Sequence, residues 1–233
     1  MVWILPYADE PERGRPFRAA ATRAILWLTL AVFALQVAGL WLEGLPRVER
    51  LGAFVPARLA GAEVGQPTPV WATLVTYAFL HGGLLHLGSN MLGLWITGDD
   101  VERRLGARGF VAAYLAFAVA AALAEAAAEP DFTGPMVGAS GAVAGLFGAY
   151  LMIRPRAVIR VAIGFLVIWR TVRLPAWLVI SSWALAQALA LGGTAPEGGA
   201  TVAYVAHLAG FALGVPLGLW LRGRPPIGRG PWG

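Results

Sequence analysis

The chain contains no cysteine and no lysine, and only 13% of its residues are charged. The absence of cysteine excludes disulfides, thiolate nucleophiles and cysteine-type metal sites, and it leaves the redox compartment undetermined. All eighteen basic residues are arginines, and they are spread between apolar segments. They form no basic run interleaved with aromatic residues, which argues against nucleic acid as a partner.

Apolar residues dominate what is present. Hydrophobic residues make up 58% of the 233 residues, and the mean hydropathy is +0.66. A soluble domain carries about 25% charged residues, roughly twice the share found here. The composition therefore predicts a polytopic membrane protein. Its length allows a single domain of about six spans of ~20 residues with short connections.

The first apolar segment covers 24–42, and four arginines precede it. No small-residue cleavage site follows it closely, so we interpret it as a retained span and not as a signal peptide. Five further segments lack arginine and contain one carboxylate, that of Glu125: about 85–98, 109–128, 139–153, 174–191 and 201–221. We predict an all-α membrane domain over 24–221, with an N-terminal tail of 1–23 and a C-terminal tail of 222–233.

Two connecting segments are less regular. The segment from Glu43 to about Val70 is expected to contain short interfacial helices. In 154–173, arginines flank an apolar centre, which predicts an interfacial or short re-entrant segment, with a seventh span as the alternative.

The arginines also predict the orientation. Fifteen lie in the two tails and in the segments 99–108 and 154–173, whereas the other three lie in the first long loop. Arginines concentrate on the cytoplasmic side, so both termini are expected to be cytoplasmic in a plasma-membrane protein.

A candidate nucleophile lies at the start of the fourth predicted span. The tetrapeptide Gly138-Ala139-Ser140-Gly141 begins a segment of about fifteen residues. A helix of that length covers roughly 22 Å, less than the ~30 Å hydrocarbon core, so its N-terminus should begin below the membrane surface. Non-helical backbone at that depth must be buried in protein or line a water-filled cavity. The N–H groups of a helix N-terminus also suit a developing oxyanion.

The same tetrapeptide also fits a small-residue packing face, because glycines recur at helical spacing in this span. The sixth predicted span has the matching feature, with Gly210, Gly214 and Gly218 at four-residue intervals. Two helices with glycine faces can approach closely, which would bring Ser140 near His207. A lone intramembrane histidine is more often a structural hydrogen-bonding group, but opposite a serine it can be a neutral general base. No Asp or Glu is adjacent to His207, so the expected arrangement is a Ser-His dyad.

His86 and Asn90 lie four residues apart on one face of the second predicted span. Each taken alone could bond loop carbonyls and hold the bundle together. As a pair they could instead donate hydrogen bonds to an oxyanion. His81 does not share this face and is expected to order the preceding loop. The three histidines lie in two separate segments without an HExxH motif, which argues against a metal site.

In combination, these motifs resemble the rhomboid family of intramembrane serine proteases. The matching residues are GASG at 138–141, His86 and Asn90, Ala206-His207-Leu208-Ala209-Gly210, Glu102-Arg103-Arg104-Leu105-Gly106, Gly134-Pro135, Trp183 and Gln187.

The resemblance implies a six-transmembrane-helix rhomboid fold with Ser140 as nucleophile and His207 as base. His86, Asn90 and the backbone N–H of Ser140 would form the oxyanion hole, and the motif glycines Gly138, Gly141 and Gly210 would support it. It also implies single-span membrane proteins as substrates within the lipid bilayer, access between the second and fifth spans, and no cofactor.

Two other functions fit parts of the pattern. One is a catalytically silent rhomboid-like protein that binds transmembrane clients. The other is a small transporter, since glycine-rich broken helices also occur there, although the six segments have no evident internal repeat.

Overall fold

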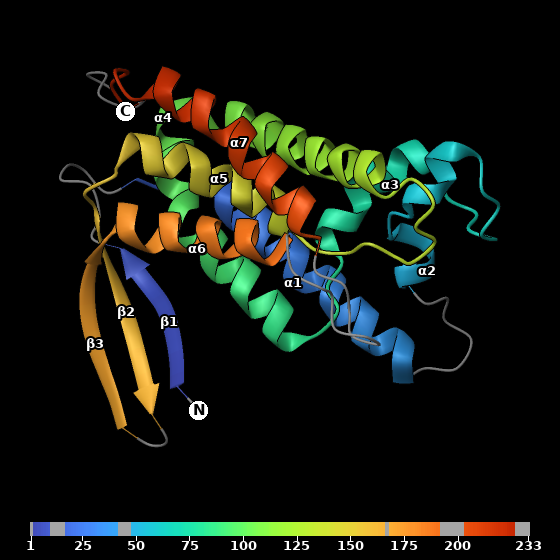
Figure 1. Ribbon diagram of the computed structural model, residues 1–233, viewed down its shortest axis with the longest axis horizontal. Coiled ribbons are helices and arrows are strands. Elements are labelled where there is room, and N and C mark those ends of the chain that lie inside the picture. Colours follow the sequence, from blue (N-terminus) through green and yellow to red (C-terminus); the bar gives the residue numbers. More distant parts are fainter. Residues whose placement is uncertain (1, 10–16, 42–47, 166–167, 192–202, 227–233) are drawn as a thin grey trace.

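The computed structural model describes residues 2–9, 17–41, 48–165, 168–191 and 203–226. Most of these residues are helical, as predicted (Figure 1). The longer helices are α1 (Ala20–Trp41), α4 (Leu84–Ala128), α5 (Ser140–Ile153), α6 (Ala176–Leu191) and α7 (Tyr204–Leu221). The loop after α1 contains short helices, also as predicted: α2 (Val48–Gly52), η1 (Pro56–Ala60), α3 (Val70–Thr76) and η2 (Tyr77–Phe79).

Three of the helices, α1, α4 and α7, are long and apolar enough to cross a membrane. Helix α4 has 45 residues, but its backbone leaves the helical region at Gly106, where φ is 72° and ψ is 165°. Since this positive φ suits glycine, Gly106 divides α4 into two parts. The second and third predicted spans lie on either side of it. The number of spans stays a prediction.

Helix α5 packs against both α4 and α7, and its contact with α7 is backbone to backbone. A β-carbon added at Gly210 would lie 2.1 Å from the carbonyl oxygen of Gly141, and one at Gly214 would lie 1.9 Å from that of Gly145. No side chain fits at these distances. The predicted close approach of the two helices is therefore confirmed, and it depends on the glycines of α7.

The glycines of α5 have two neighbours. Gly148 faces α7, as the sequence suggests, and a β-carbon there would lie 2.3 Å from the Phe211 carbonyl oxygen, whereas Gly141 and Gly145 face α4. A β-carbon at Gly141 would first meet Ala121 of α4, at 2.4 Å, and one at Gly145 would meet Phe117, at 2.3 Å. These two glycines thus let α4 approach α5 closely. Small residues on two faces place α5 in the middle of the bundle.

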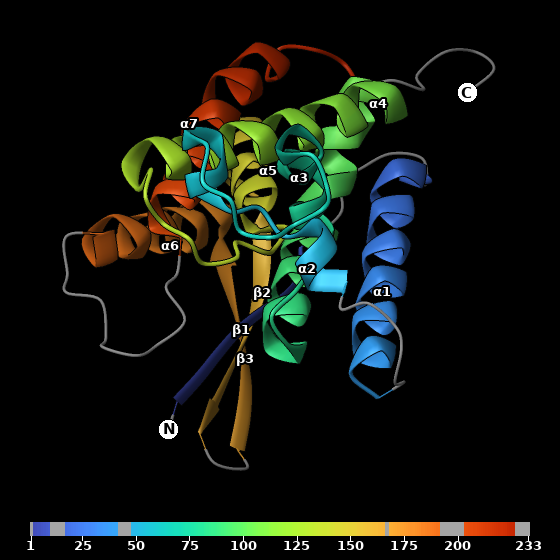
Figure 2. The same ribbon diagram turned by 90° about the vertical axis from the view of Figure 1, so that its right-hand side faces the viewer.

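Three strands at one end of the bundle were not predicted. Strands β1 (Val2–Asp9), β2 (Val158–Phe165) and β3 (Ile168–Pro175) form an antiparallel sheet in the order β1-β2-β3, and the sheet extends away from the helices (Figure 1 and Figure 2). The all-α class is thereby corrected to a mostly helical chain, and the seventh-span alternative for 154–173 is wrong. Strands β2 and β3 are rich in β-branched residues, which favour extended backbone.

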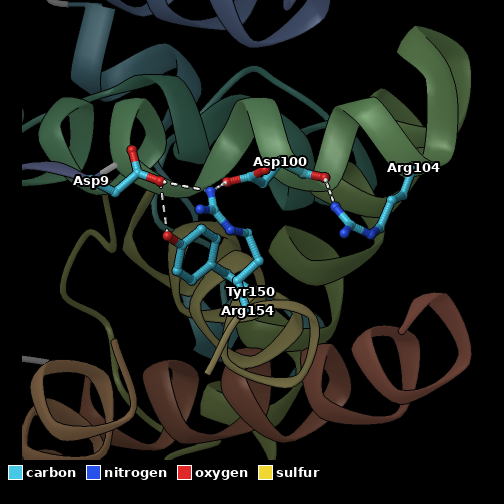
Figure 3. A network of polar contacts seen from close by, with 5 residues as sticks. All are labelled: Asp9, Asp100, Arg104, Tyr150 and Arg154. Carbon is cyan, nitrogen blue, oxygen red and sulfur yellow. Dashed lines mark hydrogen bonds and ion pairs between the residues drawn. The ribbon is translucent and has the colours of Figure 1, made fainter. Parts of the chain in front are cut away.

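Polar contacts join this sheet to the helices (Figure 3). Arg154, at the C-terminus of α5, pairs with Asp100 of α4 and with Asp9 of β1, the latter at 3.2 Å. The Tyr150 hydroxyl also donates to Asp9, at 2.9 Å, and Arg104 donates to the Asp100 carbonyl oxygen at 3.3 Å. Because these groups are partly buried, the network restrains the end of β1 against both α4 and α5.

A second polar contact anchors α1. The Glu102 side chain is 1% exposed, and its carboxylate accepts hydrogen bonds from the N–H groups of Ala21 and Thr22, at 3.0 and 2.7 Å. The Thr22 hydroxyl donates to it as well, at 2.8 Å. The first N–H groups of a helix lack intrahelical acceptors, so this carboxylate satisfies the start of α1 from α4.

Candidate active site

The structure brings Ser140 and His207 together. Ser140 is the first residue of α5, and His207 lies in the first turn of α7. The distance from Ser140 Oγ to His207 Nε2 is 2.7 Å. The glycine contacts between α5 and α7 begin within a turn of this pair, so the close packing brings the two short side chains within hydrogen-bond distance.

A third side chain fixes the orientation of the imidazole. Gln187 of α6 places its Oε1 2.7 Å from His207 Nδ1. A carbonyl oxygen can only accept a hydrogen bond, so Nδ1 carries the proton and the lone pair of Nε2 faces the serine hydroxyl. The sequence indicated no orienting carboxylate beside His207. A neutral amide from another helix takes that position, and the signal for it is that Gln187 is the one amide side chain in 174–191.

Replacing Gln187 by Met is expected to slow modification of Ser140 by a fluorophosphonate about tenfold or more, because the imidazole loses its orienting acceptor and its preferred tautomer. The rate of labelling of the purified protein in detergent measures this. Ser182→Ala is the matched control, since the Ser182 hydroxyl bonds only the Val179 carbonyl of its own helix in the described structure. Labelling of the Met variant at the wild-type rate would remove Gln187 from the site.

Aromatic side chains pack beside the histidine. The ring centroids of Trp183 and His207 are 6.0 Å apart. Phe147 packs edge to face against Trp183, with 5.0 Å between the ring centroids. Trp183 belongs to α6 and Phe147 to α5, so these rings connect the two helices next to His207. Their bulk limits the rotation of the imidazole.

His86 faces the turn that precedes Ser140. The Gly82 N–H donates to His86 Nδ1 at 3.3 Å, which leaves the ring proton on Nε2. A β-carbon at Gly138 would lie 2.7 Å from that Nε2. Gly138 also has φ of 126°, a conformation that other residues rarely adopt. A glycine is therefore required at this position both by the conformation of the turn and by the close approach of the His86 N–H.

Asn90 lies on the same face of α4 and is 4% exposed. Its amide donates to the His86 carbonyl at 3.0 Å, and its side chain lines the same cavity as Ser140. Helix α5 has no side-chain cap at Ala139, and the first N–H groups of a helix have no acceptor within it. Two side-chain donors and a helix N-terminus thus surround the space beside the serine.

His81 is 2% exposed and lies in the loop before α4. Its backbone N–H donates to Gln36 Oε1 at 3.0 Å, and its carbonyl accepts from Gln36 Nε2 at 3.1 Å. Burial, with His86 nearby, lowers the pKa of His81 to about 4, so its ring is neutral. These contacts agree with the predicted ordering of the loop, which they tie to α1.

Ser140, His207, His86 and Asn90 line one cavity of about 960 Å³. Its walls are largely apolar and run between the first part of α4 and α6. They include Leu92, Gly93 and Ile96 of α4, Val143 and Phe147 of α5, and Val179, Ile180 and Trp183 of α6. Among the residues that the structure describes, no group of three or more His, Asp or Glu side chains could hold a metal ion. The arrangement suits acyl transfer on an extended apolar chain.

Comparison with known proteins identifies a family. The family model described as Rhomboid domain matches residues 68–224. Human Rhomboid-related protein 3 is 32% identical over 203 residues, covering 83% of this chain and 48% of that protein. Rhomboid protease GluP of Bacillus subtilis is 40% identical over 83 residues, covering 36% of this chain and 16% of that protein. Rhomboid protease GlpG of Serratia proteamaculans is 32% identical over 150 residues, covering 63% and 46%. The chain spans about half or less of the length of these relatives.

Proposed function

The chain belongs to the rhomboid family, and we propose that it is an intramembrane serine protease with Ser140 and His207 as its catalytic dyad. The observation that carries the proposal is the 2.7 Å contact between Ser140 Oγ and His207 Nε2 inside an apolar cavity. Two relatives are themselves named rhomboid proteases. A silent rhomboid-like protein would not require this alignment of serine, histidine and orienting amide.

The residues of the site have the chemistry for peptide hydrolysis. Ser140 Oγ attacks the scissile carbonyl carbon while its proton passes to His207 Nε2. The carbonyl oxygen becomes an oxyanion that accepts hydrogen bonds from His86, Asn90 and the Ser140 N–H. As the C–N bond breaks, the imidazolium returns its proton to the leaving amine. Water then attacks the acyl enzyme with His207 again as base, which releases the acid and restores Ser140.

The proposed substrates are single-span membrane proteins, cleaved within or near their membrane segment. The apolar cavity walls of α4 and α6 support an apolar chain that arrives from the bilayer. In this proposal the chain has six spans within 24–221. The arginine distribution supports cytoplasmic tails at 1–23 and 222–233 in the plasma membrane.

The test is cleavage of a single-span reporter by the purified chain in proteoliposomes, with the products identified by mass spectrometry. We expect one cut within or close to the reporter's membrane segment, and fluorophosphonate labelling of the same preparation at Ser140. A preparation that binds the reporter but neither cuts it nor labels would favour the silent client-binding protein instead.

A further inference from the structure

Glu125 is the one carboxylate in the six predicted spans, and it reaches from α4 to the start of α7. Its Oε2 accepts a hydrogen bond from the backbone N–H of Ala206, at 2.9 Å. A carboxylate in a membrane span is costly to keep without a specific partner. The partner here is the residue immediately before His207.

The start of α7 needs such an acceptor. Its N-cap residue, Ala203, makes no side-chain cap bond, and the first bond within the helix is from the His207 N–H to the Ala203 carbonyl, at 3.1 Å. Ala206 therefore has no acceptor within the helix, and it is fully buried. Burial excludes water as a substitute, so Glu125 satisfies an N–H that would otherwise stay unpaired.

The same bond restrains the position of His207. On the α5 side, the first turns of α7 rest on the Gly141 carbonyl through Gly210. On the α4 side, Glu125 holds the Ala206 N–H. The two contacts lie on either side of His207 in the sequence, at one and three residues from it, and together they limit how far the first turn of α7 can rotate or slide.

We propose that Glu125 is a positioning residue, which keeps His207 Nε2 at bonding distance from Ser140 Oγ by anchoring the first turn of α7. This inference rests on the proposed protease function. The anchor acts through a hydrogen-bond acceptor at the right reach and does not require the negative charge. In a purely electrostatic role, the charge would stabilise the imidazolium. That role would require the negative charge and would tolerate a shorter side chain.

Two substitutions separate reach from charge. Glu125→Gln keeps the length and an acceptor oxygen but removes the charge, whereas Glu125→Asp keeps the charge and shortens the side chain by one methylene. We expect the Gln variant to keep kcat within threefold of wild type. The Asp and Ala variants should lose kcat by roughly ten- to a hundredfold with KM within threefold, because misplacement of a catalytic group raises the barrier without weakening uniform binding.

The matched control is Glu63→Ala. Glu63 is an exposed carboxylate in the loop between η1 and α3 and does not line the cavity, so this variant should leave kcat within twofold of wild type. Reporter cleavage in proteoliposomes gives kcat and KM, with the enzyme concentration set by fluorophosphonate titration so that misfolded protein is not counted. A purely structural role for Glu125 would lower the melting temperature and leave kcat per titrated site unchanged, which overturns the proposal.

Loss of activity in the Gln variant with retention in the Asp variant would also overturn it, in favour of the charge. If the Ala variant does not fold, the Gln and Asp pair still decides the question. The proposed function fails in a different way, through Ser140-independent cleavage or absence of cleavage by the wild type. If cleavage depends on Ser140 but the Glu125 variants keep the wild-type kcat, the positioning role is rejected and the proposed function stands.

Discussion

Ser140→Ala is expected to abolish reporter cleavage, with a fall in kcat of about 10⁴-fold or more, as for the loss of a nucleophile in other serine hydrolases. The alanine has no oxygen to form the acyl enzyme, and the remaining oxyanion donors can only assist attack by water. The kcat of His207→Ala should fall as far. In the wild type His207 Nε2 lies 2.7 Å from the serine hydroxyl, and the variant has no base to take its proton. Cleavage rates in proteoliposomes and labelling by a fluorophosphonate measure both.

The double variant gives the sharper measurement. Residues that act as one unit are not additive, so Ser140→Ala with His207→Ala should be no slower than either single variant. Two independent binding contributions would instead multiply. Ser89→Ala is the matched control, because Ser89 lines the same cavity and bonds the His86 carbonyl at 3.0 Å. Labelling that moves to Ser89, or cleavage that survives in Ser140→Ala, would reject the proposed mechanism.

The candidate site could be predicted from the sequence because its residues are conspicuous in an apolar chain. Ser140 follows a glycine turn at the start of a short span, and His207 is a polar residue in an uncharged segment. Polar side chains are costly in free energy within a membrane span, so the presence of each residue there indicates a function. Their pairing followed from the regular glycine spacing in 201–221, which the structure explains by the contact of Gly210 and Gly214 with the α5 backbone.

The sheet and its polar network could not be predicted in the same way. The Asp9 and Tyr150 side chains that bond each other are 141 residues apart in the sequence, and no local pattern in 1–23 identifies β2 as the partner of β1. In 154–173 the arginines favoured a segment at the membrane surface, although the β-branched residues around them favour strands. Local periodicity predicts whether a segment is a helix or a strand, whereas the pairing of two strands depends on a segment that is distant in the sequence.

The role of Gln187 was missed for a related reason. No carboxylate lies next to His207 in the sequence, and the orienting group is an amide on another helix. A neutral acceptor beside the imidazole costs less free energy than a carboxylate, because a buried carboxylate would carry a desolvation cost. Amides in apolar segments therefore merit the same attention as charges when a membrane site is read from sequence.

Gly214→Ala is expected to separate α7 from α5 and to destabilise the protein. The new β-carbon would lie 1.9 Å from the Gly145 carbonyl oxygen, 2.8 Å from its carbon and 3.0 Å from the Ala149 nitrogen. All three are backbone atoms, so no side-chain rotation relieves the overlap and the helices must move apart by about 1 Å. Overpacking of this kind costs about 1–3 kcal/mol or more of unfolding free energy.

The movement also reaches the site, because His207 lies two turns before Gly214 on the same helix and contacts Ser140 across the helix pair that is forced apart. A displacement of about 1 Å can cost on the order of 10²-fold in rate, so labelling of Ser140 should slow by that factor even where the variant remains folded. Gly88→Ala is the control, since Gly88 is exposed on α4 with no atom within 4 Å of an added β-carbon, and alanine there should leave the melting temperature unchanged or slightly raised. Melting temperature in detergent and labelling rate, measured on both variants, distinguish a glycine required for contact from one that is merely present. Equal values for the two would mean that α7 does not depend on its glycines to reach α5, and the link between helix packing and the distance of Ser140 from His207 would be lost.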